Sequence, residues 1–392
     1  MLILFCLFLI YTAQAGQIEE LIEYALKNSP RLKVYEELKA STKRREEYSK
    51  SLQNPSLSFG LNNLPIIRPY PSEEEPMSSF SVGISQMYML PIKRERESLM
   101  ARAEGEFLEA ELKAVERELI RDIKLKYLEW LYTFKEEELL KSILNEIKAL
   151  EKLTEENYKV GKATLADILL LKAEALRVER DIKGLIEERR IIKEEIDSLV
   201  GKSFELKGED FEVKEIDLED VDMEKTVFLK ALLEERKMLL AEIERRKVEH
   251  LPDIELMAEY MIRPGLENMV NLRVGFSIPI RKSKREDLLV LEKVEELKAK
   301  EWEIEALKLS LRREINSLKI EKERVKGLRA ITEELLKERE RELKALEISY
   351  GFGKADLRDL IRLYRELWEI RMNLLELERD LKSLSIKAEV YL

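Results

Sequence analysis

Side chains that could carry out chemistry are scarce in this chain. It has one histidine, His250, and one cysteine, Cys6. Cys6 lies in an N-terminal segment that we expect to be cleaved, so the mature chain would hold no disulfide, thiol nucleophile or cysteine-bound metal. A lone histidine beside a predicted helix–strand junction favours a surface or interfacial role over metal binding. Because no carboxylate–histidine constellation is visible either, the sequence disfavours an enzyme, and we expect no cofactor.

Methionines are a second group with possible chemistry, because thioether sulfur suits copper(I). Five of them lie near the predicted strands: Met87, Met89, Met257, Met261 and Met269. We favour packing toward lipid or toward a lumen for these side chains and predict no metal site.

The most informative residues form a motif that occurs twice. The spacing is Tyr-x-x-Gly-x-x-x-Leu-x-Asp, and the second copy follows the first at an offset of 192 residues (350 − 158). The first copy comprises Tyr158, Gly161, Leu165 and Asp167, and the second comprises Tyr350, Gly353, Leu357 and Asp359. Residues 82–85 return at the same offset as residues 274–277. The chain therefore contains two copies of one plan: a helix, a short strand pair, a very long helix, a tight turn and another long helix.

Composition indicates long helices and excludes one class of partner. Charged residues make up 38% of the chain and apolar residues 45%. Such a mixture, with few glycines and prolines, is typical of long amphipathic helices. The formal net charge of −10 disfavours nucleic acid as a partner, because binding phosphates needs a basic face.

Residues 1–15 predict a secretory signal peptide. An apolar run is followed by Ala13-Gln14-Ala15, the small-x-small pattern of a cleavage site. We expect the mature chain to begin at Gly16. The alternative, a membrane anchor, is disfavoured because a helical span needs about 20 apolar residues. No later stretch is long and apolar enough for such a helix, so entry into a membrane would require β-strands.

Apolar residues that recur every three or four positions predict the helices. The predicted ranges are 17–28, 31–53, 93–157, 165–199, 226–249, 284–349 and 355–385. Two of them run for about 65 residues, or roughly 100 Å at 1.5 Å per residue. Helices of this length belong to a coiled coil or a helical tube. Pro30 and Pro91 are expected to end the elements before them, and the glycines at 161, 351 and 353 are expected to turn the chain.

Two segments, at about 55–90 and 252–280, change to a period of two and predict strand pairs. Each predicted strand has one apolar face and one polar or small face. Four short strands cannot close a barrel with a usable interior, whereas three chains would supply twelve strands (3 × 4). Strands with apolar residues outside and polar residues inside are typical of outer-membrane barrels, although soluble sandwiches share the alternation. The residues predicted to face the membrane are Leu57, Phe59, Phe80, Val82, Leu256, Leu272, Val274, Phe276 and Ile278.

The repeats set the predicted domain organisation. After the signal peptide at 1–15, residues 16–200 form the first structural repeat and residues 226–392 the second. The segment between them, 201–225, is short, acidic and without a clear helical period. We predict a linker or a small side domain there.

Taken together, these features resemble the TolC-like outer-membrane efflux channels. The doubled turn motif carries the resemblance most specifically, and the Ala-Leu-Lys-Asn-Ser-Pro sequence at residues 25–30 agrees with it. So do the Pro-Ile-basic-basic sequences at residues 91–94 and 279–282. The resemblance implies a mainly α fold with a small β part. It implies a homotrimer whose long antiparallel helical coiled-coil tube crosses the periplasm and whose twelve-stranded β-barrel lies in the outer membrane.

The resemblance also implies a function and partners. Such a trimer is the exit duct of a tripartite efflux or secretion system, together with a periplasmic adaptor and an inner-membrane pump. The far end of the tube stays closed until those partners engage. The alternative that the residues leave open is a periplasmic coiled-coil adaptor or a holdase without a pore.

Site residues follow from the positions that match the family. Asp359 matches an acidic residue that narrows the pore, and Arg362 stands where relatives often have a second acidic residue. Tyr350 matches an aromatic that pins the closed turn through hydrogen bonds. Asp167 is either a second pore-lining carboxylate or a cap on its own helix, where a carboxylate suits the helix dipole. The helix-turn residues expected to serve adaptor docking are Tyr158, Gly161, Leu165, Gly353 and Leu357.

Overall fold

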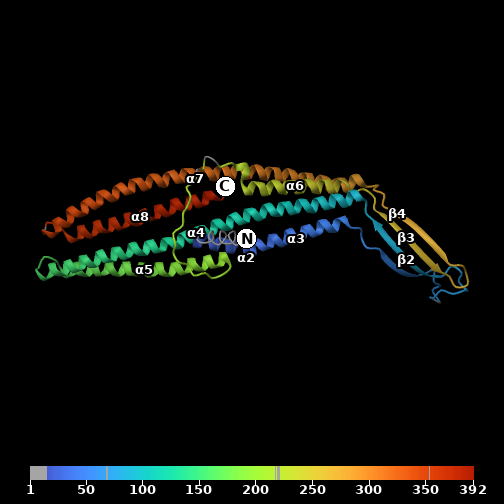
Figure 1. The fold of residues 1–392 in the computed structure, drawn as a ribbon, viewed down its shortest axis with the longest axis horizontal. Coiled ribbons are helices and arrows are strands. Elements are labelled where there is room, and N and C mark those ends of the chain that lie inside the picture. The colour runs from blue at the N-terminus through green and yellow to red at the C-terminus, as the bar shows by residue number, and fades with distance from the viewer. Residues whose placement is uncertain (1–15, 68, 217, 219–220, 353) are drawn as a thin grey trace, which may run out of the picture. The chain divides into compact units, whose positions relative to one another are not determined.

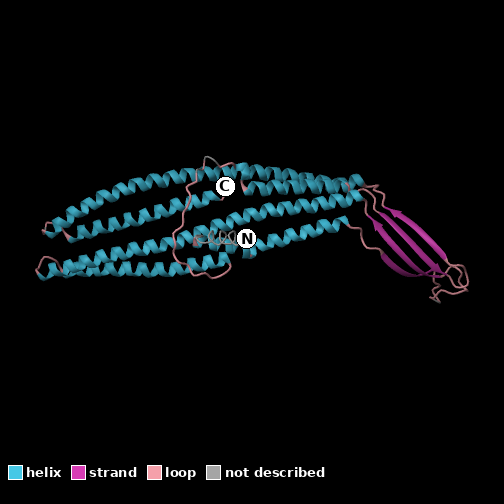
Figure 2. Ribbon diagram, viewed as in Figure 1, coloured by secondary structure: helices cyan, strands magenta, loops and turns pink. Residues whose placement is uncertain are grey.

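The structure is a computed structural model that describes residues 16–67, 69–216, 218, 221–352 and 354–392. The predicted signal peptide and Gly353 therefore lie outside the described residues. Helices dominate the described chain, which also contains one four-stranded sheet (Figure 2). The predicted mainly α class with a small β part is confirmed.

The chain divides into two compact units. Unit 1 comprises Met1–Lys33, Ala114–Thr226 and Leu309–Leu392, and unit 2 comprises Val34–Lys113 and Val227–Lys308. The units cut across the sequence repeats, because the longest helices contribute residues to both of them. The repeat boundaries at 16–200 and 226–392 thus stay a prediction.

The helices lie close to where the apolar periodicity predicts them (Figure 1). Their bounds are α2 Gln17–Asn28, α3 Pro30–Lys50, α4 Pro91–Lys159, α5 Leu165–Val200, α6 Val227–Lys247, α7 Glu286–Gly351 and α8 Leu357–Glu389, with short 3-10 turns at Met223–Lys225 and Lys282–Lys284. As expected, α2 ends before Pro30 and β2 ends before Pro91, and the two prolines are themselves the first residues of α3 and α4. A proline suits the first helical position, since its missing N–H would have no helical partner there. Within the described ranges, no helix carries an apolar stretch long enough to cross a membrane.

Unit 2 holds the sheet, whose strands run in the order β1, β2, β3, β4 with every neighbouring pair antiparallel. The bounds are β1 Ser56–Asn62, β2 Ser79–Tyr88, β3 Ile254–Ile262 and β4 Met269–Phe276. Strands from the two repeats are joined directly, since β2 pairs with β3. One prediction is wrong here, because Ile278 lies beyond the end of β4. Pro279 has no N–H to donate to a ladder, and Ile280 instead donates to the carbonyl of Ile278 at 2.9 Å.

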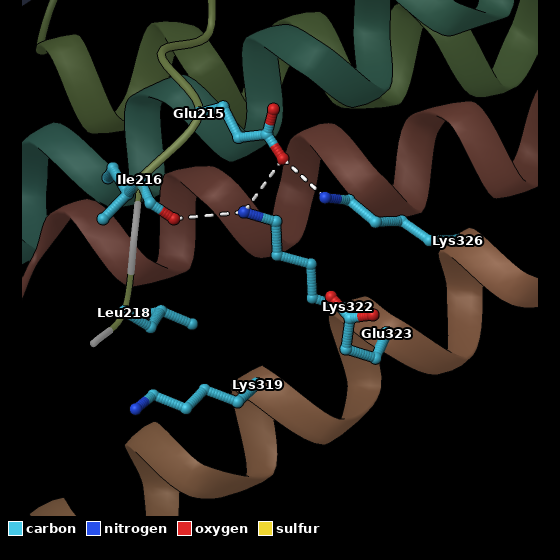
Figure 3. A pocket seen from close by; sticks show the side chains of 7 residues that line it. All are labelled: Glu215, Ile216, Leu218, Lys319, Lys322, Glu323 and Lys326. Atoms are coloured by element: carbon cyan, nitrogen blue, oxygen red, sulfur yellow. Dashed lines mark hydrogen bonds and ion pairs between the residues drawn. The ribbon is translucent and has the colours of Figure 1, made fainter.

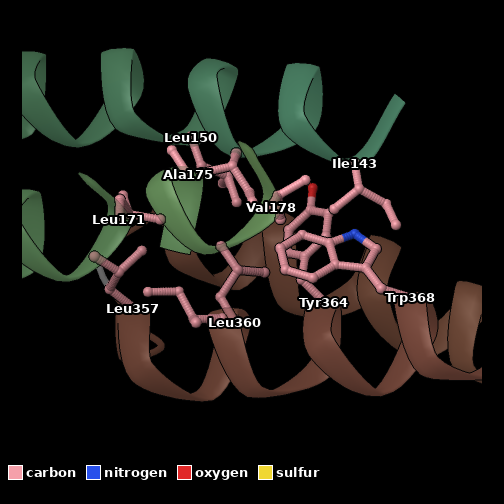
Figure 4. Packing of buried hydrophobic residues seen from close by; sticks show 11 residues of the cluster. Ile143, Leu150, Leu171, Ala175, Val178, Leu357, Leu360, Tyr364 and Trp368 are labelled. Atoms are coloured by element: carbon pink, nitrogen blue, oxygen red, sulfur yellow. The ribbon is translucent and has the colours of Figure 1, made fainter. Parts of the chain in front are cut away.

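Unit 1 is held together by a hydrophobic cluster that draws on both repeats (Figure 4). Its buried members are Ile143, Ile147 and Leu150 from α4, Leu171, Ala175 and Val178 from α5, and Leu357, Leu360, Ile361, Tyr364 and Trp368 from α8. Partly buried residues of α7 pack against the cluster as well. Burying a leucine or isoleucine side chain stabilises a fold by about 1.5–3 kcal/mol. The cluster therefore holds the helix pair of one repeat against the helix pair of the other.

The described part of the linker belongs to unit 1 and has neither helix nor strand before its 3-10 turn, yet hydrogen bonds and ion pairs tie it to the helices of that unit. The Tyr127 hydroxyl of α4 donates to the carbonyl of Glu209 at 2.9 Å. Burial, together with nearby carboxylates of which Glu209 is the foremost, raises the pKa of Tyr127 to about 12. Further along, Glu215 pairs with Lys326 at 2.7 Å and with Lys322 at 3.2 Å beside a cavity (Figure 3). Hydrogen bonds from these lysines, with Lys326 foremost, lower the pKa of Glu215.

Candidate functional site

The strand register places the apolar side chains of the sheet on one face. Phe59 lies opposite Val82, Val82 opposite Tyr260, and Tyr260 opposite Val270. Directly opposed residues of antiparallel strands share a face, so a single apolar face crosses all four strands. The predicted membrane-facing residues other than Ile278 lie on it, namely Leu57, Phe59, Phe80, Val82, Leu256, Leu272, Val274 and Phe276. All of them are exposed, from 38% for Val82 to 78% for Leu272.

The opposite face of the sheet is polar and contains its best-buried residues. Ser79 is fully buried, and Ser81 and Glu259 are only 5% and 9% exposed. The Asn271 amide nitrogen donates to a Glu259 carboxylate oxygen at 3.4 Å, and Arg273 lies 3.5 Å from the same oxygen. In water, a sheet buries its apolar face and exposes its polar one. In this sheet the apolar face is exposed and the buried residues lie on the polar face, which suits an apolar environment outside it.

The methionines near the strands also fall mainly on the polar face. By register, this holds for Met87, Met257, Met261 and Met269, whereas Met89 lies beyond β2. Met261 is directly opposite Met269, and the Asn271 amide nitrogen lies 3.0 Å from the Met261 sulfur. Among the residues that the structure describes, no group of three or more His, Cys, Asp or Glu side chains could hold a metal ion.

The first copy of the turn motif closes on itself. Gly161 has φ +72°, a left-handed conformation that glycine adopts without strain. Its N–H donates to the Tyr158 carbonyl at 3.0 Å, and the next N–H reaches back five residues, which is a Schellman ending for α4. Thr164 then caps α5 in a capping box with Asp167, whose carboxylate accepts the Thr164 N–H at 2.8 Å. Asp167 is therefore engaged in capping its own helix.

The second copy shares the backbone ending but differs in its cap. The Lys354 N–H donates to the Ser349 carbonyl at 2.9 Å, which matches the Lys162-to-Asn157 bond at the 192-residue offset (354 − 162 and 349 − 157). Here Asp356 takes the N-cap position and accepts the Arg358 N–H at 3.1 Å.

Asp359, the equivalent of Asp167, is consequently not part of a capping box. Its carboxylate pairs with Arg362 one turn later at 3.3 Å, and both side chains are exposed. Gly353 lies outside the described residues, so its predicted role in the turn stays a prediction.

The tyrosines and leucines of the two copies lie in different surroundings. Tyr350 packs against the hydrophobic cluster, and its hydroxyl accepts a 3.4 Å hydrogen bond from the Asn157 amide at the end of α4. Tyr158 is exposed. Leu165 is 55% exposed, whereas Leu357 is 3% exposed within the cluster. Because Leu357 is buried in its own chain, we assign it a packing role in place of the predicted contact with a partner.

No family model matches the chain, and no curated protein shows significant sequence similarity to it. Its fold, in contrast, is similar to solved structures. The outer membrane protein VceC of Vibrio cholerae has a TM-score of 0.79 at 18% identity over 96% of both chains. The Campylobacter jejuni CmeC outer membrane channel has a TM-score of 0.76 at 12% identity, over 96% of this chain and 85% of CmeC. The open state of the Neisseria gonorrhoeae MtrE outer membrane channel has a TM-score of 0.73 at 14% identity, over 96% of this chain and 88% of MtrE.

This chain has the TolC-like fold. Within that fold, two polar contacts that the sequence analysis missed join the helix pairs of unit 1. Arg365 of α8 donates to Glu174 of α5 at 2.5 Å, and the Glu174 side chain is only 8% exposed. Arg371 and the indole N–H of Trp368 donate to the two oxygens of Glu146 on α4, at 2.9 and 3.0 Å.

One signal for the first of these contacts was present in the sequence. Glu174 stands three residues after Leu171 and four before Val178, on the apolar side of its helix. A carboxylate on such a face needs a partner, because burying an unpaired charge is costly. The identity of the partner could not be read from the sequence, since Arg365 lies 191 residues away (365 − 174).

Proposed function

We propose that this chain is the subunit of a homotrimeric outer-membrane channel that serves as the exit duct of a tripartite efflux or secretion system. The observation that carries the proposal is the inverted sheet, whose apolar face is exposed and whose buried residues, Ser79, Ser81 and Glu259 among them, lie on the polar face. Lipid would cover the apolar face, and the polar face would line a water-filled lumen. The TolC-like fold supports this arrangement, because similar structures are described as an outer membrane protein and outer membrane channels. Such a duct performs no reaction on what it exports.

The edge strands support a ring of chains. In the part of the chain that the structure describes, β1 pairs only with β2 and β4 only with β3. A free edge is costly in a bilayer, where no water satisfies the backbone N–H and C=O groups. Three copies would supply twelve strands (3 × 4), and pairing β4 of each copy with β1 of the next would close a barrel.

Exposed apolar residues on two helices of unit 1 support the same ring. On α7, Leu309, Ile320 and Ile331 repeat every 11 residues (320 − 309 and 331 − 320) and are exposed. That spacing keeps them on one side of the helix. On α5, Leu169 and Leu176 are exposed and seven residues apart (176 − 169). Contact between two different surfaces of this kind is heterologous, and it closes into a ring when the rotation permits.

We propose that residues at the second copy of the turn motif, between α7 and α8, form a gate. Three copies of Asp359, each with its Arg362, would surround the pore, and Tyr350 would steady the closed turn through its bond with Asn157. Asp167 is not included, because it caps α5.

The first turn is the better candidate for contact with a periplasmic adaptor, which would link the channel to an inner-membrane pump. Tyr158 and Leu165 are exposed there, and Gly161 shapes the turn between them. Gly353 joins this group through its match to Gly161 in the sequence.

The direct test is single-channel conductance of detergent-purified protein in a planar bilayer, with the mass of the oligomer measured on the same preparation. A trimer with small, cation-selective openings is the expected result. A water-soluble monomer or dimer without conductance would contradict the channel and favour the coiled-coil adaptor or holdase.

A pair of neighbouring variants on β4 makes the test specific to the sheet. Leu272 lies on the apolar face and Asn271 on the polar face. We expect Leu272→Arg to lower the fraction of protein assembled in membranes, because arginine on the lipid face costs about 2–4 kcal/mol near the midplane. Asn271→Arg should assemble normally and change conductance or selectivity. Equal assembly of the two variants would contradict the proposed lipid-facing side.

A further inference from the structure

The loop between β1 and β2 presents two isoleucines almost completely to solvent. Ile66 is 99% exposed and Ile67 is 93% exposed. Tyr70, three residues later, is exposed as well. The loop follows the end of β1 and precedes β2, so it lies at the end of the sheet away from α3 and α4 (Figure 1). Large aliphatic side chains with such high solvent exposure indicate a surface that contacts an apolar environment.

Hydrogen bonds brace the loop near its two ends, on either side of the isoleucines. Asn63 has φ +50°, and its side-chain amide donates to the Met77 carbonyl at 3.1 Å. The Ser78 hydroxyl accepts the Ser72 N–H at 3.1 Å and donates to the Glu75 carbonyl at 2.7 Å. Four prolines stiffen the segment further: Pro65, Pro69, Pro71 and Pro76.

The two limbs of the loop differ in chemistry. The limb that leaves β1 carries Ile66 and Ile67, and it continues from Leu61, which is exposed on the apolar face of the sheet. The limb that returns to β2 carries Glu73 and Glu75, both exposed. An apolar limb beside an acidic one suits the boundary between lipid and water, where one side of a segment is buried and the other is hydrated.

We propose that this loop anchors the chain in the membrane by inserting Ile66 and Ile67 into the outer leaflet while the acidic limb stays in water. The proposal rests on the proposed outer-membrane location. It extends the lipid-facing surface beyond the ends of the strands. The proposed contact of the loop is lipid, and the alternative that the experiment tests is contact with a neighbouring copy of the chain.

Site-directed spin labelling can test the anchor, because Cys6 is the only cysteine of the chain. In a Cys6→Ser background, nitroxide labels are placed singly at Ile66→Cys and Ile67→Cys. Glu75→Cys serves as the water-facing control on the same loop, and Phe59→Cys reports the apolar face of the sheet. Each labelled protein is reconstituted in liposomes, and its collisions with oxygen, which concentrates in lipid, are compared with its collisions with a water-soluble nickel chelate.

The anchor predicts that the labels at 66, 67 and 59 collide severalfold more with oxygen than with nickel, and that the label at 75 does the reverse. Water-like labels at 66 and 67 beside a lipid-like label at 59 would overturn the anchor and leave the channel intact. Strong spin–spin broadening at 66 or 67 would overturn it in favour of contact between copies at the pore mouth. A water-like label at 59 would overturn the proposed function itself.

Discussion

The two copies of the turn motif have the same spacing, yet they are stabilised in different ways. The first copy is stabilised locally: Thr164 and Asp167 form a capping box, and Leu165 is exposed. The second copy is stabilised by packing: Leu357 is buried in the hydrophobic cluster, and Tyr350 packs against it. We therefore expect the second turn to depend more than the first on packing against other helices.

A single exchange in the motif accounts for part of this difference. Thr164 in the first copy corresponds to Asp356 in the second (356 − 164 = 192). Asp356 caps α8 with its own carboxylate, so Asp359 is not needed for capping and forms an exposed pair with Arg362. A repeated motif thus preserves the geometry of a turn while the roles of its side chains diverge.

Truncating the leucine of each motif copy should produce the largest difference in stability between the two turns. We expect Leu357→Ala to lower the free energy of unfolding by about 2–5 kcal/mol, as is typical of a buried leucine. Its counterpart Leu165→Ala should change stability by no more than about 0.5 kcal/mol, because the side chain is exposed. The measurement is the denaturant midpoint of helix loss in detergent, followed by circular dichroism. Equal losses in the two variants would refute the contrast between local and packing stabilisation.

The contact between the helices that follow the two turns should have the next largest effect. Glu174→Gln weakens the pair with Arg365 and leaves a buried amide in place of the carboxylate. We expect a loss of about 1–3 kcal/mol, the usual cost of disrupting a charged hydrogen bond at a buried group. Glu187 forms an exposed pair with Arg190 on the same α5, and Glu187→Gln is the matched control that should leave stability unchanged. Hydrogen exchange should become faster in α5 and α8 of the Glu174→Gln variant. Exchange in both helices that stays the same as in the unsubstituted protein would contradict the role of this contact.

Removal of each motif aspartate provides a smaller and more selective test of stability. Asp167→Ala removes half of a capping box and should cost about 0.5–2 kcal/mol. The loss should appear as faster hydrogen exchange in the first turn of α5. Asp359→Ala should leave exchange in the first turn of α8 unchanged, since Asp356 supplies that cap. A matching rise in exchange at α8 would show that Asp359 also stabilises its helix end.

The parts of this fold that depend on local sequence were predictable. The predicted range 17–28 matches α2, and the strand alternation predicted that Leu57 and Leu272 share one apolar face, as the register shows. One detail that failed is the end of β4, which stops at Phe276 and leaves Ile278 outside the strand. Burial of Leu357 and the pairing of Glu174 with Arg365 were out of reach, because they depend on contacts between residues nearly 200 positions apart.

The smallest structural change should give the clearest reading of function at the second turn. If three copies of Asp359 surround the pore, Asp359→Asn would remove three negative charges and leave Arg362 unpaired. Preference for cations should then fall or reverse, because rings of charged side chains set selectivity in channels. The reversal potential under a salt gradient in a planar bilayer measures this preference, and Asp167→Asn should leave it unchanged, since Asp167 caps its own helix. A reversal potential that shifts with Asp167→Asn and not with Asp359→Asn would place the pore-lining charge at the first turn and reverse the comparison drawn between the two copies.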